Sequence, residues 1–125
     1  MSDRAYRHVE VERVGETAIV RLTRRDYDEV SLDEMGAELA RPVDEDGCRN
    51  LILVLGPREP GCLYSVFLAK LLNLHRRLGT NGGKLILAAV PPLALNVIST
   101  SGLERFFHME PDRDAALASV EAATR

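Results

Sequence analysis

The amino-acid sequence predicts an α/β domain in which helices cover a mixed central β-sheet, with the elements in the order ββαβαβαβα. Three observations predict this class. Residues 8–22 hold two short segments that suit an antiparallel hairpin. Residues 50–55 and 84–90 are continuous apolar runs, as in strands buried on both faces. A helical pattern separates these runs, and a strand–helix–strand unit of about 40 residues favours parallel strands joined by a right-handed crossover.

The hairpin is expected from the pattern of the first two segments. Residues 8–14 alternate apolar and polar side chains, which is typical of a half-buried strand. Gly15 and Glu16 supply a turn, and residues 17–22 supply the second strand. We therefore expect the sheet to begin with two antiparallel strands.

The first helix is predicted from a capping signal. Residues 23–30 are charged and lack periodicity, so we expect a loop there. Ser31 followed by Glu34 is the capping-box pattern, and it predicts a helix over residues 32–43. Pro42 has no amide proton and should bend or end this helix.

The central helix follows a loop rich in proline and glycine at residues 56–61 and begins at Ser65. Residues of its apolar face recur every three or four positions, at Leu68, Leu71, Leu72, His75 and Leu78. The glycines in residues 80–83 end it. His75 points towards the apolar face and is expected to be a core residue rather than a ligand.

The last third of the chain repeats the alternation of helix and strand. Pro91 and Pro92 suit the first turn of a helix, where a missing amide proton costs nothing, and Gly102 stops that helix. Residues 103–109 are expected to form a short final strand. Residues 110–125 are expected to form a terminal helix.

Length and composition bound the class of protein. A chain of 125 residues with 46% hydrophobic residues predicts a single domain over residues 1–125, with an ordered body at about residues 8–120 and short tails. The net charge of −3 disfavours a nucleic-acid binder. The sequence shows neither an apolar run of roughly 18 residues nor the apolar middle of a secretion signal. We expect a cytoplasmic protein that binds neither nucleic acid nor membrane.

Reactive side chains do not form a pattern that indicates an enzyme. Cys48 and Cys62 lack the spacing of a zinc site, and His8, His75 and His108 lie far apart in the sequence. Neither a nucleophile–base pair nor paired carboxylates can be placed. We therefore expect a protein without catalytic residues, without a cofactor and without a bound metal.

Several residues, taken in order, resemble the STAS domain family, the fold of bacterial anti-sigma factor antagonists. The helix of residues 68–83 ends in two glycines before a strand, and prolines open the next helix. A Ser-Gly-Leu turn at residues 101–103 then leads to Phe106 and Phe107 before the last strand. The resemblance extends from about His8 to Val120. It implies a STAS-like (SpoIIaa-type) sandwich, with an N-terminal hairpin and about four helices on a mixed sheet.

The resemblance also implies a function, that of an anti-sigma factor antagonist-like module in a partner-switching pathway that regulates transcription. Antagonists of this family bind an anti-sigma factor that is also a serine kinase. Phosphorylation of a serine at the start of the central helix breaks the complex, and a phosphatase reverses the change. The position corresponds to Ser65. The usual Asp-Ser-Ser/Thr-Gly motif is replaced by Tyr64, Ser65, Val66 and Phe67, and Gly56 stands where an acidic residue is common.

Ser65 has two interpretations, which the sequence leaves open. Serine is a preferred helix N-cap and stabilises a helix by about 1 kcal/mol relative to alanine. A phosphorylated serine at a helix start would accept hydrogen bonds from unpaired amides. It would also add roughly −1.5 to −2 charges to the surface. Residue type favours the cap, whereas the family position favours the phosphoacceptor.

Bulky apolar residues surround the predicted switch. Tyr64, Val66 and Phe67 at the start of the central helix, with Leu93 and Leu95 on the next helix, stand where the family commonly has small or polar residues. We expect these residues to form an apolar patch for a protein partner or a second copy of the chain. The expected state is therefore a monomer or a weak homodimer. Alternatively, Val66 and Phe67 fill core space beside residues 56–61.

Lys70 and Arg77 share the outer face of the central helix, where they either pair with an acidic partner or are solvated. Two other functions stay open. The chain is then either a STAS scaffold that is never phosphorylated or a domain that binds a small ligand. The second alternative predicts a nucleotide pocket near residues 56–61.

Overall fold

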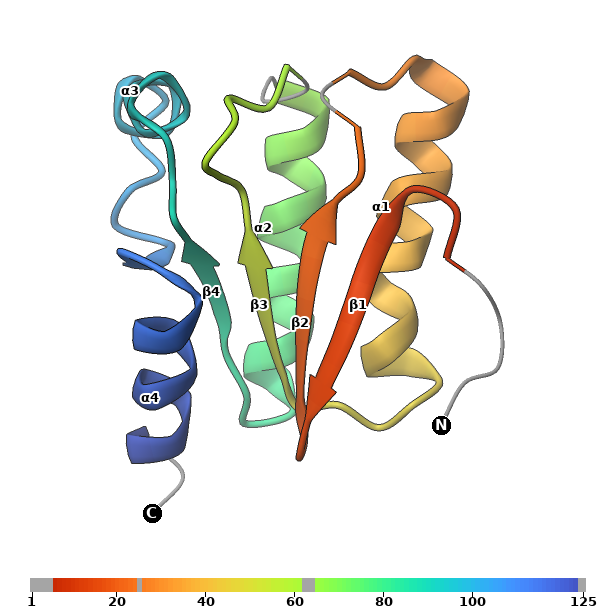
Figure 1. Cartoon of the computed structure of the whole chain (residues 1–125), viewed down its shortest axis with the longest axis vertical. Coiled ribbons are helices and arrows are strands. Elements are labelled where there is room, and N and C mark those ends of the chain that lie inside the picture. Colours follow the sequence, from red (N-terminus) through yellow and green to blue (C-terminus); the bar gives the residue numbers. More distant parts are fainter. Residues whose placement is uncertain (1–5, 25, 62–64, 124–125) are drawn as a thin grey trace.

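The computed structural model describes residues 6–24, 26–61 and 65–123 (Figure 1). It confirms the predicted order of strands and helices. The elements are β1 (Val9–Val14), β2 (Thr17–Leu22), α1 (Glu29–Asp44), β3 (Asn50–Val54), α2 (Ser65–Thr80), β4 (Leu85–Ala88), α3 (Pro92–Thr100), β5 (His108–Glu110) and α4 (Arg113–Ala123).

The five strands form one mixed sheet in the order β1-β2-β3-β4-β5. β1 and β2 are antiparallel, with Val14 paired to Thr17 around the turn at Gly15, whose φ of 60° is one that glycine adopts without strain. β2, β3, β4 and β5 run parallel to one another. The predicted hairpin and the predicted parallel crossover are both confirmed.

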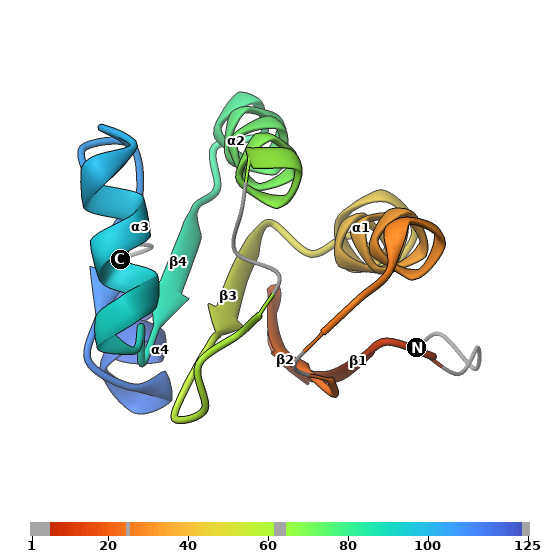
Figure 2. The ribbon, with the colours of Figure 1, turned by 90° about the horizontal axis from the view of Figure 1, so that it is seen from above.

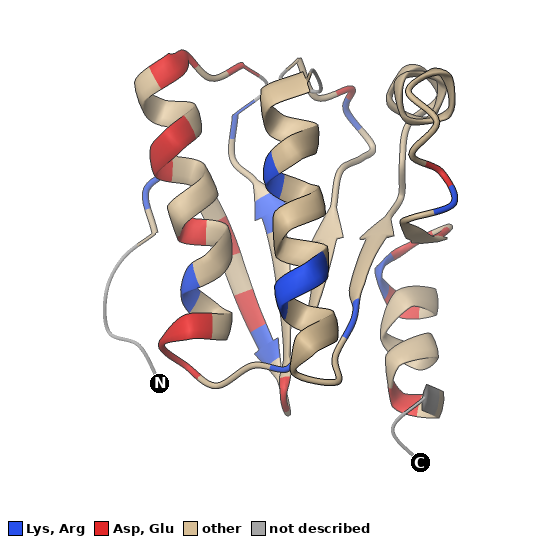
Figure 3. Ribbon diagram, turned by 180° about the vertical axis from the view of Figure 1, so that it is seen from behind, with Lys and Arg blue, Asp and Glu red and all other residues tan. Residues whose placement is uncertain are grey.

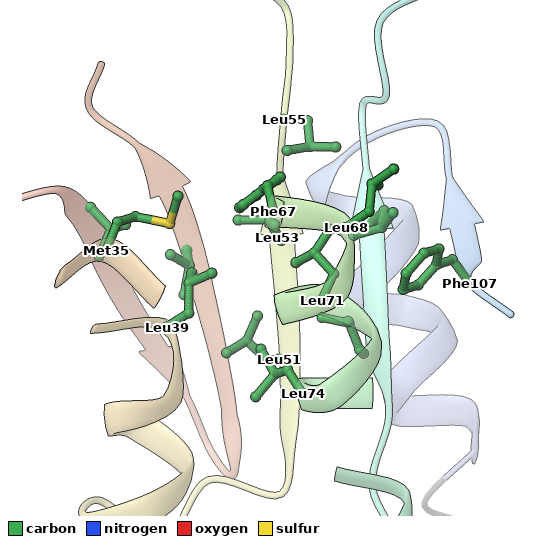
Figure 4. Packing of buried hydrophobic residues seen from close by; sticks show 14 of the residues in the cluster. Met35, Leu39, Leu51, Leu53, Leu55, Phe67, Leu68, Leu71, Leu74 and Phe107 are labelled. Atoms are coloured by element: carbon green, nitrogen blue, oxygen red, sulfur yellow. The ribbon is translucent and has the colours of Figure 1, made fainter. Parts of the chain in front are cut away.

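The larger core lies between one face of the sheet and helices α1 and α2 (Figure 2). Figure 4 shows Leu51 and Leu53 of β3 against Phe67, Leu71 and Leu74 of α2. All five side chains are at most 4% exposed. Because alternate residues of a strand point to opposite faces, Ile52 of β3 turns away from α2.

A smaller core lies on the second face of the sheet. Ile19, Ile52 and Ile86, from three neighbouring strands, pack there with Ala116 and Val120 of α4. Two apolar clusters on opposite faces explain why β3 and β4 are continuous apolar runs rather than alternating ones.

Helix α1 begins earlier than the sequence predicted. Its N-cap is Asp28, whose carboxylate accepts a hydrogen bond at 2.7 Å from the backbone amide of Ser31. The prediction that Ser31 caps the helix is wrong, because Ser31 is buried within the first turn and its hydroxyl donates to the Asp28 carbonyl oxygen. Pro42 lies inside the helix, which continues to Asp44.

The last strand is shorter than predicted. Residues 103–107 form turns, with the amide of Phe106 bonded to the carbonyl of Leu103, and only His108–Glu110 pair with β4. Phe107 leaves the turn to enter the larger core, where it is 5% exposed. Burial in the core, and not strand pairing, therefore places Phe107, whereas Phe106 is 47% exposed.

Candidate functional site

The amino ends of α1, α2 and α3 gather at one end of the molecule. Each of these helices follows a strand of the parallel set β2, β3 and β4. The carboxyl ends of parallel strands lie at the same edge of a sheet. The three helices that follow these strands therefore begin at that edge. Figure 1 shows this edge at the top, with α1 and α2 running down from it and α3 lying across it.

Ser65 is the first residue of α2 and is exposed to solvent. No acidic residue occupies the first turn of this helix. The amides of a first turn lack partners within the helix and carry a partial positive charge. The predicted position is therefore reachable and electrostatically suited to a phosphate. Tyr64, the neighbouring predicted interface residue, lies outside the described residues, as does Cys62.

The neighbouring residues Val66 and Phe67 differ in their exposure to solvent. Val66 is 49% exposed, whereas Phe67 is fully buried. Successive residues of a helix lie about 100° apart around its axis, so one of the two faces solvent while the other joins Leu71 in the core. The prediction that Phe67 contributes to a surface patch is corrected, because its ring fills the larger core.

Leu93 and Leu95 lie on the first turn of α3 and are 67% and 41% exposed. Ala94, between them, is buried. The helix starts with Pro91 as its N-cap, and this residue has no side chain able to accept a hydrogen bond. Exposed leucines at a helix start give this end of the molecule an apolar character.

Glu59 caps the amino end of α3. Its carboxylate accepts hydrogen bonds from the amides of Leu93 and Ala94, at 2.9 and 3.1 Å. The sequence analysis missed this role, because 34 residues separate Glu59 from Leu93. The sequence did offer one signal: Pro91, which precedes Pro92, has no side chain that can cap the helix. The free amides at the start of α3 therefore needed an acceptor from another segment.

Val30 is a further apolar residue that sequence reasoning missed. It belongs to the first turn of α1 and is 68% exposed. Because the helix was predicted to begin after Ser31, Val30 fell in the expected loop. Its place at the amino end of α1 puts it on the same edge of the molecule as Val66, Leu93 and Leu95. We call these four residues the apolar edge.

Lys70 is bound within the domain. Its ammonium lies 3.0 Å from a carboxylate oxygen of Asp33 on α1, and its side chain crosses Gly36, where a Cβ would lie 2.9 Å from Cδ of Lys70. Arg77 in the last turn of α2 pairs with Asp44, the last residue of α1. Figure 3 shows acidic residues on α1 and basic residues on α2. The two cations therefore brace α1 against α2.

The remaining reactive residues have structural surroundings. His75 is partly buried, and its ring meets Phe107 edge to face, with centroids 6.1 Å apart. Burial raises the pKa of the Cys48 thiol, which favours the unreactive protonated form. Among the residues that the structure describes, His, Cys, Asp and Glu side chains do not gather in a group of three able to hold a metal ion.

Comparison with solved structures identifies the fold. A STAS domain protein from Planctomyces limnophilus matches with a TM-score of 0.77 and 12% identity, over 90% of this chain and 97% of that chain. An anti-sigma factor antagonist from Mycobacterium paratuberculosis matches with a TM-score of 0.71 and 22% identity, over 90% and 92%. The phosphorylated Bacillus cell fate determinant SpoIIAA matches with a TM-score of 0.66 and 20% identity, over 89% and 98%.

The class is therefore a small α/β domain whose sheet combines an N-terminal hairpin with parallel strand–helix units. Within that class, the chain is a STAS-fold domain. No protein-family model matches the sequence. None of the helices in the described part of the chain is long and apolar enough to cross a membrane.

Proposed function

We propose that the chain is an anti-sigma factor antagonist-like module that binds a serine-kinase anti-sigma factor, with Ser65 as its phosphorylation switch. One observation carries the proposal. An exposed hydroxyl stands at the amino end of α2, next to Val66 and at the same edge as the exposed Leu93 and Leu95. A kinase can reach this hydroxyl, and a partner that covers the apolar edge would cover Ser65 with it.

Electrostatics supplies the switch. A phosphate on Ser65 would add roughly −1.5 to −2 charges beside Val66, at the edge of the molecule that carries four exposed apolar side chains. Burial of that charge in a protein interface costs several kcal/mol unless a cation pairs with it. Lys70, the cation of α2 that is nearest to Ser65 in the sequence, is engaged with Asp33. Phosphorylation is thus expected to block docking without any rearrangement of the fold.

The similar structures support the direction of the proposal. One of them is SpoIIAA in its phosphorylated form, and another is an anti-sigma factor antagonist. The sequence around Ser65 departs from the family motif at Tyr64, Val66 and Phe67. The burial of Phe67 shows that one of these departures serves the core. Val66 stays at the surface and belongs to the interface that we propose.

The test compares charge at Ser65 with charge elsewhere on α2. Affinity capture from cells of the source organism uses the unaltered protein, Ser65→Ala, Ser65→Asp and Asn73→Asp. Asn73 is exposed on the same helix, two turns further along. We expect a serine-kinase anti-sigma factor with the unaltered protein, Ser65→Ala and Asn73→Asp, and its loss with Ser65→Asp.

A second step examines the modification. The purified kinase and ATP should raise the mass of the unaltered protein by one phosphate and leave Ser65→Ala unchanged. A partner set that is the same for Ser65→Asp and the unaltered protein, with no phosphorylation, contradicts the switch. That result favours a STAS scaffold that works without phosphorylation.

A further inference from the structure

A hollow of about 320 Å³ lies at the end of the domain opposite to Ser65. The second half of α2, the start of β4 and the turn before β5 form it, and they contribute His75, Leu85 and Phe107 among others. Figure 1 shows the connection from α2 to β4 at the edge of the sheet opposite to the start of α2. The hollow is therefore separate from the proposed switch and from the loop of residues 56–61.

Packing holds the walls of the hollow in place. Phe107 is 5% exposed in the larger core, and its ring meets that of His75 edge to face. Gly83 approaches the neighbouring segment so closely that a Cβ would lie 1.7 Å from the carbonyl oxygen of Arg49. The amide of Lys84 donates a hydrogen bond at 2.9 Å to the side-chain oxygen of Asn50. A ligand would therefore find the hollow already formed.

Apolar side chains form much of the inner surface. Leu85, Phe106 and Phe107 line the hollow, and Phe106 is 47% exposed. An apolar ligand that covered this ring would release water from it, which is favourable. The volume lies at the lower end of the range of small-molecule sites, roughly 300–1,000 Å³, which are also mostly apolar with a few polar groups.

The polar side chains of the hollow are basic. Lys84 and Arg105 line it and are exposed to solvent. Within the described part of the chain, neither side chain forms a hydrogen bond or an ion pair, and the ring nitrogens of His75 have no hydrogen-bond partner either. Two cations and one imidazole are therefore available to a ligand.

The nearest carboxylates in the sequence have other partners. Among the described residues, no acidic side chain lines the hollow. Glu104 precedes Arg105, but its carboxylate accepts a hydrogen bond at 2.9 Å from the hydroxyl of Ser99. His108, which also lines the hollow, lies 2.5 Å from a carboxylate oxygen of Glu110. The charge left at the hollow favours an anion.

We propose that this hollow binds a small organic acid, a molecule with a single carboxylate on an apolar chain or ring. The carboxylate binds Lys84 and Arg105, because ammonium and guanidinium groups form strong, charge-assisted hydrogen bonds with it. The apolar part packs against Leu85, Phe106 and Phe107. A strongly hydrated anion with several charges would leave these apolar walls without a partner, and a second copy of the chain is the alternative that the test distinguishes.

Titrations followed by the amide resonances of the whole domain test the site with three probes. Octanoate has both the carboxylate and the apolar chain, acetate has the carboxylate alone, and octanol has the chain alone. The variants are Lys84→Gln, Arg105→Gln and Phe106→Ser. The matched control is Arg58→Gln, which removes an exposed arginine from the loop after β3. Thermal unfolding of each variant checks that it folds.

Octanoate should shift the resonances of residues 83–85 and 105–108, and it should bind about tenfold or more tightly than acetate or octanol. Lys84→Gln and Arg105→Gln should each weaken octanoate binding about fivefold, because each removes one exposed charge. Phe106→Ser should weaken octanoate binding as well, since it removes part of the apolar wall. Arg58→Gln should bind octanoate as the unaltered protein does.

Three results would overturn the proposal. These are unchanged resonances with octanoate, acetate or octanol binding as tight as that of octanoate, and equal weakening in Arg58→Gln. A fourth concerns the alternative occupant. If the resonances of residues 83–85 and 105–108 move with protein concentration and not with octanoate, the hollow is an interface between two copies of the chain.

Discussion

The carboxylate of Glu59 accepts a hydrogen bond from the backbone amide of Leu93 at 2.9 Å. This contact fastens the loop after β3 to the first turn of α3, and the same loop leads towards α2. One carboxylate thereby joins the loop after β3 to the helix that presents Leu93 and Leu95.

Replacement of Glu59 by alanine should lower the free energy of unfolding by about 1 kcal/mol, since two amides at the start of α3 would lose the acceptor that caps them. Urea denaturation measures the change. Glu10→Gln is the control, because Glu10 is exposed on β1 and caps no helix. Equal stability of the two variants would show that solvent caps α3 as well as Glu59 does.

The double variant Leu93→Glu with Leu95→Glu should abolish capture of the partner and reduce any self-association. Both side chains are exposed, so the free energy of unfolding should change by only about 0.5 kcal/mol. Sedimentation velocity and the capture experiment provide the measurements. Phe106→Glu is a matched control, since Phe106 is 47% exposed but lies beyond the far end of α3. Unchanged binding by the double variant would remove α3 from the interface.

Truncation of two neighbouring residues of α2 should have different effects, one mainly on stability and the other mainly on partner binding. Phe67→Ala should destabilise the protein by about 3–5 kcal/mol, because it empties a fully buried site in the larger core. Val66→Ala should change stability by only about 0.5 kcal/mol, yet weaken partner binding. Urea denaturation gives the first comparison and capture the second. A small effect of Phe67→Ala would contradict the placement of its ring.

The cap of α1 should make stability depend on acid pH. The hydrogen bond from the backbone amide of Ser31 lowers the pKa of Asp28 below its ordinary value of 3.8. A lowered carboxyl pKa contributes stability that is present above the unfolded-state pKa and is lost as pH falls through the folded-state value.

Asp28→Asn isolates this contribution, because asparagine caps a helix as well as aspartate but does not titrate. The difference in melting temperature between the unaltered protein and Asp28→Asn should be constant above about pH 5 and should move in favour of the variant below about pH 4. Thermal unfolding followed by circular dichroism at pH 7, 5, 4 and 3 measures it. A difference that stays constant across this range would contradict the cap.

The order of elements could be predicted because each depends on local signals. Continuous apolar runs marked β3 and β4, and the spacing of leucines marked α2. The helix and strand boundaries that were predicted wrongly depend on competition between neighbouring residues. Asp28 and Ser31 are both good caps, and the burial of Ser31 gave the role to Asp28. Phe107 was assigned to a strand, but its burial against α2 held that segment in turns.

The candidate site also has a part that could be predicted from the sequence and a part that could not. Ser65, Val66, Leu93 and Leu95 were named from the family resemblance and their positions at helix starts, and all four are exposed. The role of Glu59 was not found, because this residue and the amides of α3 that it binds lie in segments that meet only in the folded chain.

Periodicity and composition are enough to establish an α/β sheet with a hairpin, the parallel crossover and a helix that starts at Ser65, because these features arise from interactions between near neighbours in the chain. Long-range packing established which of those residues are reachable. It buried Phe67 and engaged Lys70 with Asp33. Exposure and charge pairing depend on contacts between distant segments, and no local pattern specifies them.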